Sequence, residues 1–273
     1  MKSLIKMETI EKTSNMESLE DQYYQLLERH LRGLVSDETF YSRIEQFAEN
    51  GLAVAYHSLG ERAEDSGQDE EACRLWRIGA ESGDKFSQKD LALHYEMGKG
   101  VPYDNDQAIL WYKKSGSCSL LSSDNQAAYH LAVLRKYAEE KFADATGFAA
   151  EQYTDGMQAL LNGNLAAAVD HWYSSYLNGD PRGEVWHAWR MFHVIEDFDD
   201  NDELYIEEEE MALRAVAETF SKLSHPSCWF LMGYLYHVGI CYMHNKKKAM
   251  EYYQRAADAG AEFAKERLNA INL

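Results

Sequence analysis

Apolar residues recur along most of this chain at spacings of three and four, which is the pattern of one buried helix face. Phe40, Ile44 and Phe47 fall on such a face, in a helix that we expect to begin after Ser36. Gly51 then supplies a helix stop. The sequence has only 3 Pro, the residue that most often breaks a helix. The pattern therefore predicts an all-α protein.

One helix–loop–helix pattern occurs twice, toward opposite ends of the chain. Residues 91–116 read LALHYEMGKGVPYDNDQAILWYKKSG, and residues 232–257 read MGYLYHVGICYMHNKKKAMEYYQRAA. In both, a small residue is followed by Tyr and then Gly, and after a polar loop by Ala and an aromatic pair. Weaker copies begin near Leu59 and Gly156. Repetition of one hairpin predicts a stacked array, and such arrays mostly act as binding surfaces.

The recurring positions have physical reasons. A small residue lets two helices cross closely, and the Gly that ends the first helix takes a left-handed conformation. The aromatic pair, such as Trp111-Tyr112, is expected to fill the groove made by the neighbouring hairpin. In this alignment Trp76, Trp111 and Trp172 occupy matching places, and we expect them in the core.

With these residues in view, the chain resembles the Sel1-like repeat proteins, relatives of the tetratricopeptide class. The family pattern is a first helix ending LG-x-x-Y-x-x-G-x-G-V, followed by a second helix bearing WY-x-x-AA-x-x-G. Residues 91–116 and 232–260 match it closely, and residues 59–83 and 156–179 match about half of it. The resemblance covers about half of the chain. It implies a right-handed α-solenoid of stacked helix-turn-helix repeats, with the concave face lined mainly by the first helix of each hairpin.

The same pattern divides the chain into segments. We expect a disordered N-terminus (1–16), a helical cap (17–51), repeats 1 and 2 (52–116), an irregular helical insertion (117–147), a degenerate repeat (148–182), irregular helices with an acidic loop at 196–210 (183–225), and a final repeat with a capping helix (226–273). The irregular middle section interrupts the repeats, and it is where we expect an individual function to have been added.

The net charge and the cysteine content restrict the kind of partner and the compartment that we expect. With 27 Lys and Arg against 46 Asp and Glu, the net charge is −19, which repels nucleic acid and attracts a partner with a basic surface. Solubility is the alternative explanation of this charge. The 4 Cys form no CxxC pair, which indicates reduced thiols. We expect a cytoplasmic protein, because no signal-peptide core and no apolar run long enough to span a membrane is present.

The segment from Asp197 to Glu208 has oxygen-bearing residues at positions 1, 3, 5 and 12 of a calcium-loop pattern. The sixth position, which should be Gly, is Asp202. Ten of the fifteen residues from 196 to 210 are acidic, so such matches arise easily. We interpret this segment as a solvated acidic loop that can dock a basic partner, and we expect no bound metal.

Four of the 10 histidines, His57, His94, His130 and His237, recur at similar places on the first helix of a repeat. They are read either as lining of the concave face or as half-buried polar positions, because no HExxH or comparable metal-ligand spacing occurs. The chain has no P-loop, GxGxxG or GxSxG motif. Neither a cofactor nor a catalytic residue is expected.

These observations favour a non-catalytic scaffold that holds a protein partner on its concave face. The resemblance implies scaffold, adaptor or regulator roles, and some bacterial members are immunity proteins that neutralise secreted toxins. An immunity role is the sharpest version of our hypothesis, because the partner would be a toxin with a basic surface. The alternatives are a regulatory or secretion-associated adaptor and, further off, a metal-binding or hydrolytic enzyme.

The contact residues are predicted from helix faces, residue type and charge. Trp186, Trp189 and Arg190 lie outside the repeat pattern and are of the types that dominate interaction surfaces. The alternative for the two tryptophans is the core of the irregular region. The full predicted set is Tyr56, His57, His94, Tyr95, Trp186, Trp189, Arg190, Asp199, Asp200, Asp202, Tyr236 and His237.

Overall fold

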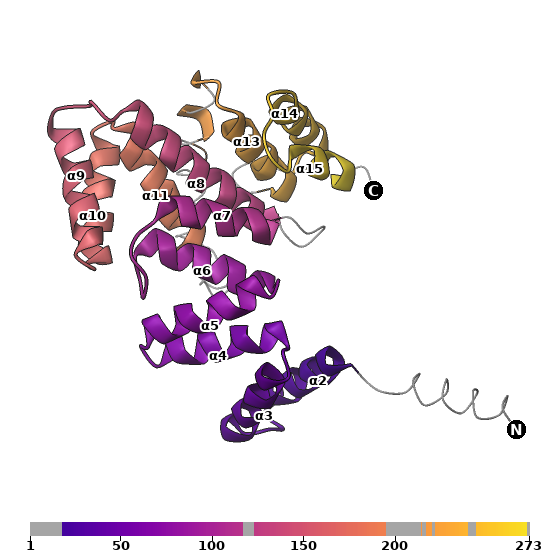
Figure 1. Cartoon of the computed structure of the whole chain (residues 1–273). Helices are drawn as coiled ribbons and strands as arrows, with labels where there is room; N and C mark the ends of the chain where they lie inside the picture. The colour runs from indigo at the N-terminus through magenta and orange to yellow at the C-terminus, as the bar shows by residue number, and fades with distance from the viewer. Residues whose placement is uncertain are drawn as a thin grey trace, which may run out of the picture. The chain divides into compact units, whose positions relative to one another are not determined.

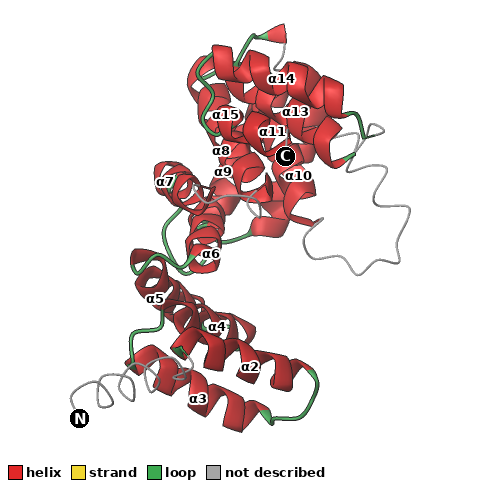
Figure 2. Ribbon diagram, turned by 90° about the vertical axis from the view of Figure 1, so that its right-hand side faces the viewer, coloured by secondary structure: helices red, strands yellow, loops and turns green. Residues whose placement is uncertain are grey.

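The computed structural model describes residues 18–116, 123–194, 214, 217–219, 222–239 and 244–271. It consists of two compact units, Met1–Ser87 and Gln88–Leu273, which are taken in turn below. Throughout the described residues the regular structure is helical, with no strand among them (Figures 1 and 2). The prediction of an all-α fold built from successive helical hairpins is confirmed.

The first unit is a run of four short helices joined by tight turns. They are α2 (Leu19–Leu31), α3 (Asp37–Glu49), α4 (Ala53–Asp65) and α5 (Asp69–Glu81). The predicted face of α3 is buried, with Phe40, Ile44 and Phe47 in one cluster with Tyr23. Ser36 caps α3 as expected, because its side chain accepts from the backbone N–H of Thr39. Each helix packs on the next in the chain, so the core of this unit is made of local contacts.

The second unit continues the hairpins and then departs from them. Its helices are α6 (Lys85–Met97, which begins in the last residues of the first unit), α7 (Asn105–Gly116), α8 (Ser123–Lys141), α9 (Phe148–Leu161), α10 (Leu165–Leu177), α11 (Pro181–Val194), α13 (Pro226–Val238), α14 (Lys246–Asp258) and α15 (Ala264–Ile271). The most extensive helix contacts are those of α9 with α10, α13 with α14, α10 with α11, and α7 with α8.

Helix α8 packs against three other helices of this unit. It contacts α7 before it in the chain, α11 and, beyond a long gap in sequence, α13 (Figure 1). Helices α9 to α11 are therefore an excursion, after which α13 returns to stack beside α8. The sequence from Tyr129 to Ala132 resembles the first helix of a repeat, which agrees with the place of α8 beside α13. In space, the repeats run from α7 and α8 directly to α13 and α14.

A glycine against an aromatic ring marks the helix crossing in three hairpins. A methyl group added at Gly60 would lie 2.2 Å from Trp76, one at Gly156 would lie 2.5 Å from Trp172, and one at Gly233 would lie 2.7 Å from Tyr253. The predicted role of these small residues in close helix crossing is confirmed. Each ring rests on the glycine of its own hairpin, and Trp172 additionally stacks on Trp186 of α11, with centroids 3.9 Å apart.

The predicted alignment of Trp111 with Trp76 and Trp172 was wrong by one residue. Tyr112 lies at the same spacing from Ala92 as Tyr253 does from Gly233, and Tyr112 is completely buried. Trp111 lies to one side, where Lys114 Nζ sits 3.7 Å from its ring centroid. Counted from the Ala of the second helix (Ala72, Ala108, Ala168 or Ala249), the ring at the crossing is four residues on in each hairpin, whereas Trp111 is only three residues from Ala108.

The ends of the helices follow the chemistry expected from the sequence. Gly98 and Gly239, which end the first helices of the two clearest repeats, have φ of 61° and 87°, in the left-handed region. Asp104 Oδ1 accepts from the backbone N–H of Gln107 over 3.0 Å and so caps α7. Asn164 caps α10 in the same way.

Replacing Gly156 by Ala is expected to destabilise the protein. The new methyl group would overlap Trp172, whose ring is held against Trp186 and cannot withdraw. Overpacking costs about 1–3 kcal/mol, which outweighs the gain of up to about 1 kcal/mol in helix propensity. Urea unfolding of Gly156→Ala checks this, with Glu151→Ala on the exposed face of the same helix as the control. A variant as stable as the parent would contradict the tight crossing.

Candidate functional site

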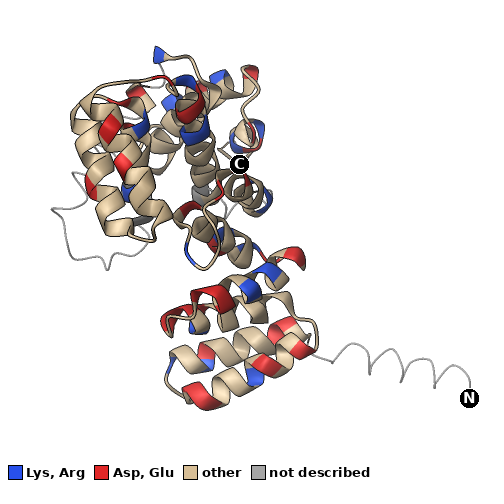
Figure 3. Ribbon diagram, turned by 60° about the vertical axis from the view of Figure 1, so that its left-hand side comes forward, with Lys and Arg blue, Asp and Glu red and all other residues tan. Residues whose placement is uncertain are grey.

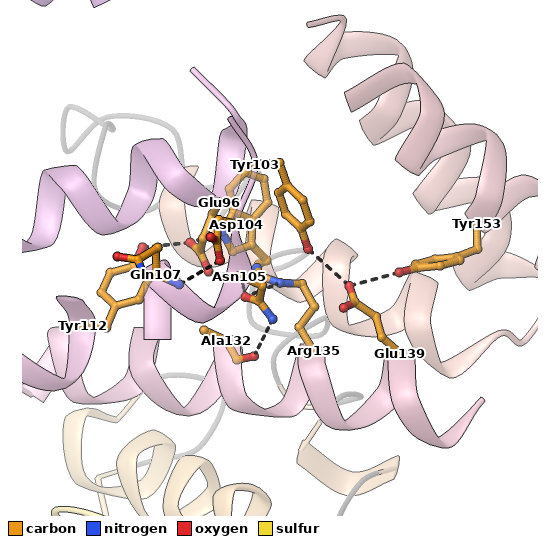
Figure 4. A network of polar contacts seen from close by, with 11 residues as sticks. Glu96, Tyr103, Asp104, Asn105, Gln107, Tyr112, Ala132, Arg135, Glu139 and Tyr153 are labelled. Carbon is orange, nitrogen blue, oxygen red and sulfur yellow. Dashed lines mark hydrogen bonds and ion pairs between the residues drawn. The ribbon is translucent and has the colours of Figure 1, made fainter. Parts of the chain in front are cut away.

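A buried ion pair lies where four helices of the second unit meet. Glu96 comes from α6 and Arg135 from α8, and Arg135 Nη2 donates to Glu96 Oε1 over 2.5 Å (Figure 4). Tyr112 of α7 and Trp189 of α11 both donate to Glu96 Oε2, over 2.8 and 2.6 Å. The side chains of Glu96 and Arg135 are 0% and 1% exposed. Such deep burial of a carboxylate is tolerated because three donors share its charge.

Arg135 is held on further sides. Its Nε donates to Asn105 Oδ1 over 3.1 Å, its Nη2 donates to the same oxygen, and its guanidinium lies 4.4 Å from the ring centroid of Trp186. Burial alone would lower the pKa of Arg135, but the charge of Glu96 and its acidic neighbours outweighs burial and raises it. The guanidinium therefore stays charged, and the pair acts as a fixed electrostatic joint.

A second group of polar contacts continues the network along α8. Glu139 Oε1 accepts from Tyr153 of α9 over 3.1 Å and from Tyr103 over 3.4 Å (Figure 4). The pKa values of both tyrosines are raised, chiefly by burial and then by charges that include Glu139. The Arg182 guanidinium covers the other side of Tyr153, 4.3 Å from its ring centroid. These hydroxyls stay protonated and act as donors at neutral pH.

This network holds helices together and offers no entry for a substrate, because its central charges are sealed from solvent. It fixes α6, α7, α8 and α11 against one another. None of its charged members was predicted from the sequence, because the partners lie far apart in the chain. The one available signal was Arg135 itself, a charge within the apolar helix pattern around Leu131 and Leu134.

His130 joins α8 to the C-terminal repeat. Its Nδ1 lies 3.0 Å from Ser227 Oγ, and its Nε2 lies 3.0 Å from the backbone oxygen of Glu262. The ring packs on Phe230, with centroids 3.9 Å apart. Burial, aided by His225, lowers the pKa of His130 to about 3, so the ring is neutral at physiological pH. A recurring histidine of the repeat pattern thus serves as a neutral hydrogen-bonding joint.

Five of the predicted contact residues lie in the interior. Trp186, Trp189 and His94 are 0%, 4% and 1% exposed. Tyr95 and Tyr236 are also buried. For the two tryptophans, the core alternative describes their position. These five side chains belong to the core and do not form part of the exposed surface.

The remaining predicted residues differ in exposure. Tyr56, His57 and His237 are half-buried, and Tyr56 donates to the backbone oxygen of Ala48 over 3.1 Å. Arg190 is exposed. Asp199, Asp200 and Asp202 lie outside the described residues, as does the stretch with the calcium-loop pattern.

Tyr173 and Tyr176 of α10 contact His187 of α11, and we name the surface that these residues form with the nearby Leu177 and Arg190 the Arg190 patch: Tyr173, Tyr176, Leu177, His187 and Arg190. Tyr173 and Leu177 are 44% and 63% exposed and lie one turn apart on α10. Both tyrosine rings contact the ring of His187, at centroid distances of 5.1 and 4.7 Å. Burial and the charge of Arg190 lower the pKa of His187 to about 4, so the patch carries the single positive charge of Arg190. The sequence pointed to Arg190 but missed Tyr173 and Leu177, which were taken only as parts of the repeat.

Three further observations bear on chemistry. Within the described residues, no group of three or more His, Cys, Asp or Glu side chains is arranged to hold a metal ion. Cys73 and Cys228 are buried thiols outside any disulfide, and burial raises the pKa of Cys228, which makes it a poor nucleophile. None of the described helices combines the length and the apolar character that crossing a membrane requires.

Two segments of this chain match a known repeat family. The Sel1 repeat family model matches residues 86–119, which include most of α6 and all of α7, and residues 230–260, which hold most of α13 and all of α14. No curated protein matches this chain.

Two solved structures are similar at low identity. A Sel1 repeat protein from Oxalobacter formigenes shares 19% identity over 94% of this chain and 66% of its own, with a TM-score of 0.35. A protective antigen of uropathogenic Escherichia coli strains, c5321, which displays an SLR fold, shares 18% identity over 96% of this chain and 58% of its own, with a TM-score of 0.36. This chain thus spans less than two thirds of the length of each, and at these TM-scores the likeness supports no argument about function.

Hairpins with small residues at their crossings, repeated along an all-α chain, define a helical-repeat protein. The two segments matched by the family model identify the kind of repeat: residues 86–119 and 230–260 are Sel1 repeats.

Neutralising Glu96 alone is expected to destabilise the second unit strongly. Glu96→Gln would leave the Arg135 charge buried without its counter-charge, which costs about 3–5 kcal/mol. Replacing both residues, as Glu96→Gln with Arg135→Met, should recover part of this loss. Urea unfolding of the two single variants and the double variant measures the coupling, and Glu140→Gln on the exposed side of α8 is the control. Additive single-variant losses would contradict a coupled pair.

Acidification is expected to weaken the junction between α8 and α13. The unfolded chain binds a proton at the ordinary histidine pKa of 6.5, whereas folded His130 binds one only near pH 3. Stability therefore falls as the pH drops from 6.5 toward 3, by up to about 1.4 kcal/mol per pH unit for this group. His187, with its pKa lowered to about 4, acts in the same direction.

Urea unfolding between pH 7.5 and pH 4.5 checks this dependence. His130→Gln should show a shallower fall than the parent, and His244→Gln, at an exposed position, should keep the parent slope. Equal slopes for the parent and His130→Gln would rule out the proposed linkage.

Proposed function

We propose that this chain is a non-catalytic protein-binding scaffold and that a protein partner contacts the Arg190 patch. The observation that carries the proposal is the grouping of Tyr173, Leu177 and Arg190 on the exposed side of α10 and α11. Tyr and Arg are enriched where interfaces hold most of their binding energy, because they combine large contact area with polar ends. A patch of this composition fits a protein surface better than a small polar ligand.

The site is supported by a rigid base. The buried Trp172 and Trp186, which adjoin Tyr173 and His187 in the sequence, stack with an interplanar angle of 12°, and Trp189 donates a hydrogen bond to Glu96. A surface held in one conformation loses little entropy on binding. The predicted interaction role of Trp186 and Trp189 is thereby replaced by an indirect one, in which they hold α11 in place and Arg190 makes the contact.

The finer proposal is that the partner is a toxin with a basic surface and that this chain acts as its immunity protein in the bacterial cytoplasm. The net charge of −19 supports it, because an acidic chain attracts a basic partner over long distances. Ten of the negative charges lie between residues 196 and 210. A toxin gene beside the gene for this chain would favour this proposal.

A regulatory adaptor is the second candidate, and the division into two compact units favours it. Each unit has exposed apolar side chains of its own, such as Leu34 in the first and Leu177 in the second. An adaptor would use the two units for different partners, whereas an immunity protein would use both for one.

Removing the exposed side chains of the Arg190 patch is expected to weaken partner binding without unfolding the protein. The full chain is first co-purified from its native host, and the bound protein is identified by mass spectrometry. Calorimetry with that protein should then show Tyr173→Ala with Arg190→Ala binding at least about tenfold more weakly, because central interface residues each contribute about 2 kcal/mol or more.

The control is Leu161→Ala with Lys265→Ala, which removes one exposed apolar and one basic side chain outside the patch. It should bind like the parent, and both double variants should keep the parent's unfolding midpoint. Undiminished binding by the Tyr173 and Arg190 variant would remove the patch as the contact surface. Absence of any stoichiometric protein partner would count against the scaffold function itself.

A further inference from the structure

The first unit contains a groove that the proposed function does not use. Its lining includes Glu20, Tyr24, Leu52, Val54, Asp84 and Phe86, and its volume is about 310 Å³. These residues come from the first turns of α2, the start of α4 and the turn between α5 and α6. All of them belong to the first unit, so the groove is complete within it. A space of this size is at the low end for ligand pockets and holds one or two side chains of a peptide.

Two aromatic rings in the lining are turned toward solvent. Tyr24 is 48% exposed and Phe86 is 58% exposed, although both are large apolar side chains that folding normally covers. Phe86 is supported by the ring of His57, at a centroid distance of 5.4 Å, so the predicted contact residue His57 lies just behind the groove. Leu52 and Val54 add aliphatic surface. The lining is therefore apolar, although its rings are exposed to solvent.

The rim is negatively charged. Glu20 and Asp84 both belong to the lining, and Lys85 is the one basic residue among the lining residues. Asp84 is fixed in place because its Oδ2 accepts from the backbone N–H of Ser87 over 2.7 Å. The pKa of the Tyr24 hydroxyl is raised by burial and then by these same two carboxylates, which is the effect of a negative local field.

The first unit carries a net negative charge of its own. Residues 1–87 hold 10 Lys and Arg against 18 Asp and Glu, a net charge of −8. Residues 88–273 hold 17 against 28, a net charge of −11, of which −10 lies in the acidic segment 196–210. Figure 3 shows the same excess of acidic positions on α2 to α5. A basic ligand is therefore attracted to the first unit.

An arginine side chain matches each part of this lining. Its guanidinium stacks on aromatic rings and pairs with carboxylates through a planar set of donors, while its aliphatic stem packs on apolar surface. Lysine provides charge and stem but not the planar stacking group. A small anion is disfavoured by the two carboxylates, and a purely aliphatic ligand would leave their negative charge uncompensated.

We propose that this groove binds an arginine side chain, with a neighbouring aliphatic residue, in an extended segment of the partner protein. The inference rests on the proposed protein-binding function and adds a contact that is separate from the Arg190 patch. It identifies the chemistry that the partner must present: an exposed arginine beside a leucine-like side chain.

The first test uses a fluorescein-labelled hexapeptide, Gly-Leu-Arg-Leu-Gly-Gly with both ends blocked, and the full chain at low salt. Anisotropy should show saturable binding. Replacing Arg by citrulline, which keeps the shape and removes the charge, should weaken binding at least about tenfold, and replacing it by Lys should give an intermediate value. Equal binding of the arginine and citrulline peptides would overturn the inference.

The second test locates the binding. Glu20→Gln with Asp84→Asn should weaken arginine-peptide binding at least about tenfold, and Asn retains the capping role at the start of α6. The matched control, Glu49→Gln with Glu70→Gln, changes the net charge equally at two exposed acids outside the groove and should stay within about twofold of the parent. Phe86→Ala should weaken binding as well, and unfolding midpoints confirm that each variant is folded.

The outcomes separate this inference from the proposed function. If the groove variants bind the peptide as the parent does, or if the control weakens binding equally, the groove is not the site. If Phe86→Ala changes the molecular mass of the protein in solution, the groove holds a second copy of the chain and the inference fails. If the identified partner requires the Arg190 patch while no arginine peptide binds, the scaffold function stands and the groove inference falls.

Discussion

The crossing of two helices at a glycine beneath an aromatic ring is the contact on which three hairpins of this protein depend. Gly60, Gly156 and Gly233 each lie where a single added methyl group would meet a Trp or Tyr ring. The ring closes the hairpin, and the short backbone distance that results sets the angle at which the next helix leaves. Because side chains are close-packed at the crossing, the geometry has few alternatives. Stacking of hairpins follows from this one local fit.

A second constraint acts where the repeats are interrupted. Helix α8 receives α13 across a long sequence separation, and two polar joints hold the helices around it. His130 connects α8 to the C-terminal repeat, and Glu96 with Arg135 connects α8 to α6, α7 and α11. Buried polar groups of this kind tolerate only arrangements in which their partners are met. They therefore specify one docking position for the excursion where apolar packing alone would allow several.

The sequence was sufficient for the helical fold and for the two clearest repeats, since periodicity, capping residues and small residues at crossings act locally. It was not sufficient for the joints. Glu96 and Trp189 are separated by most of the second unit, and nothing around either residue indicates that they meet. The same limit applied to the predicted contact residues: Trp186 and Trp189 have the composition of an interaction surface, but their burial depends on α10, which periodicity alone does not place. Arg190 was named from its residue type and its place outside the repeat pattern, and its exposure on α11 leaves it as a predicted contact residue.

The pairing of α8 with α13 also has a consequence for the order in which the chain acquires its structure on the ribosome. The helices of the first unit contact their immediate successors, so each can be completed soon after it emerges. Helix α8 must wait while the whole excursion is synthesised before its C-terminal neighbour exists. During that interval the side of α8 where His130 later packs on Phe230 is uncovered. Nascent second units are thus more dependent on protection by chaperones than nascent first units, and slow translation through the excursion prolongs that dependence.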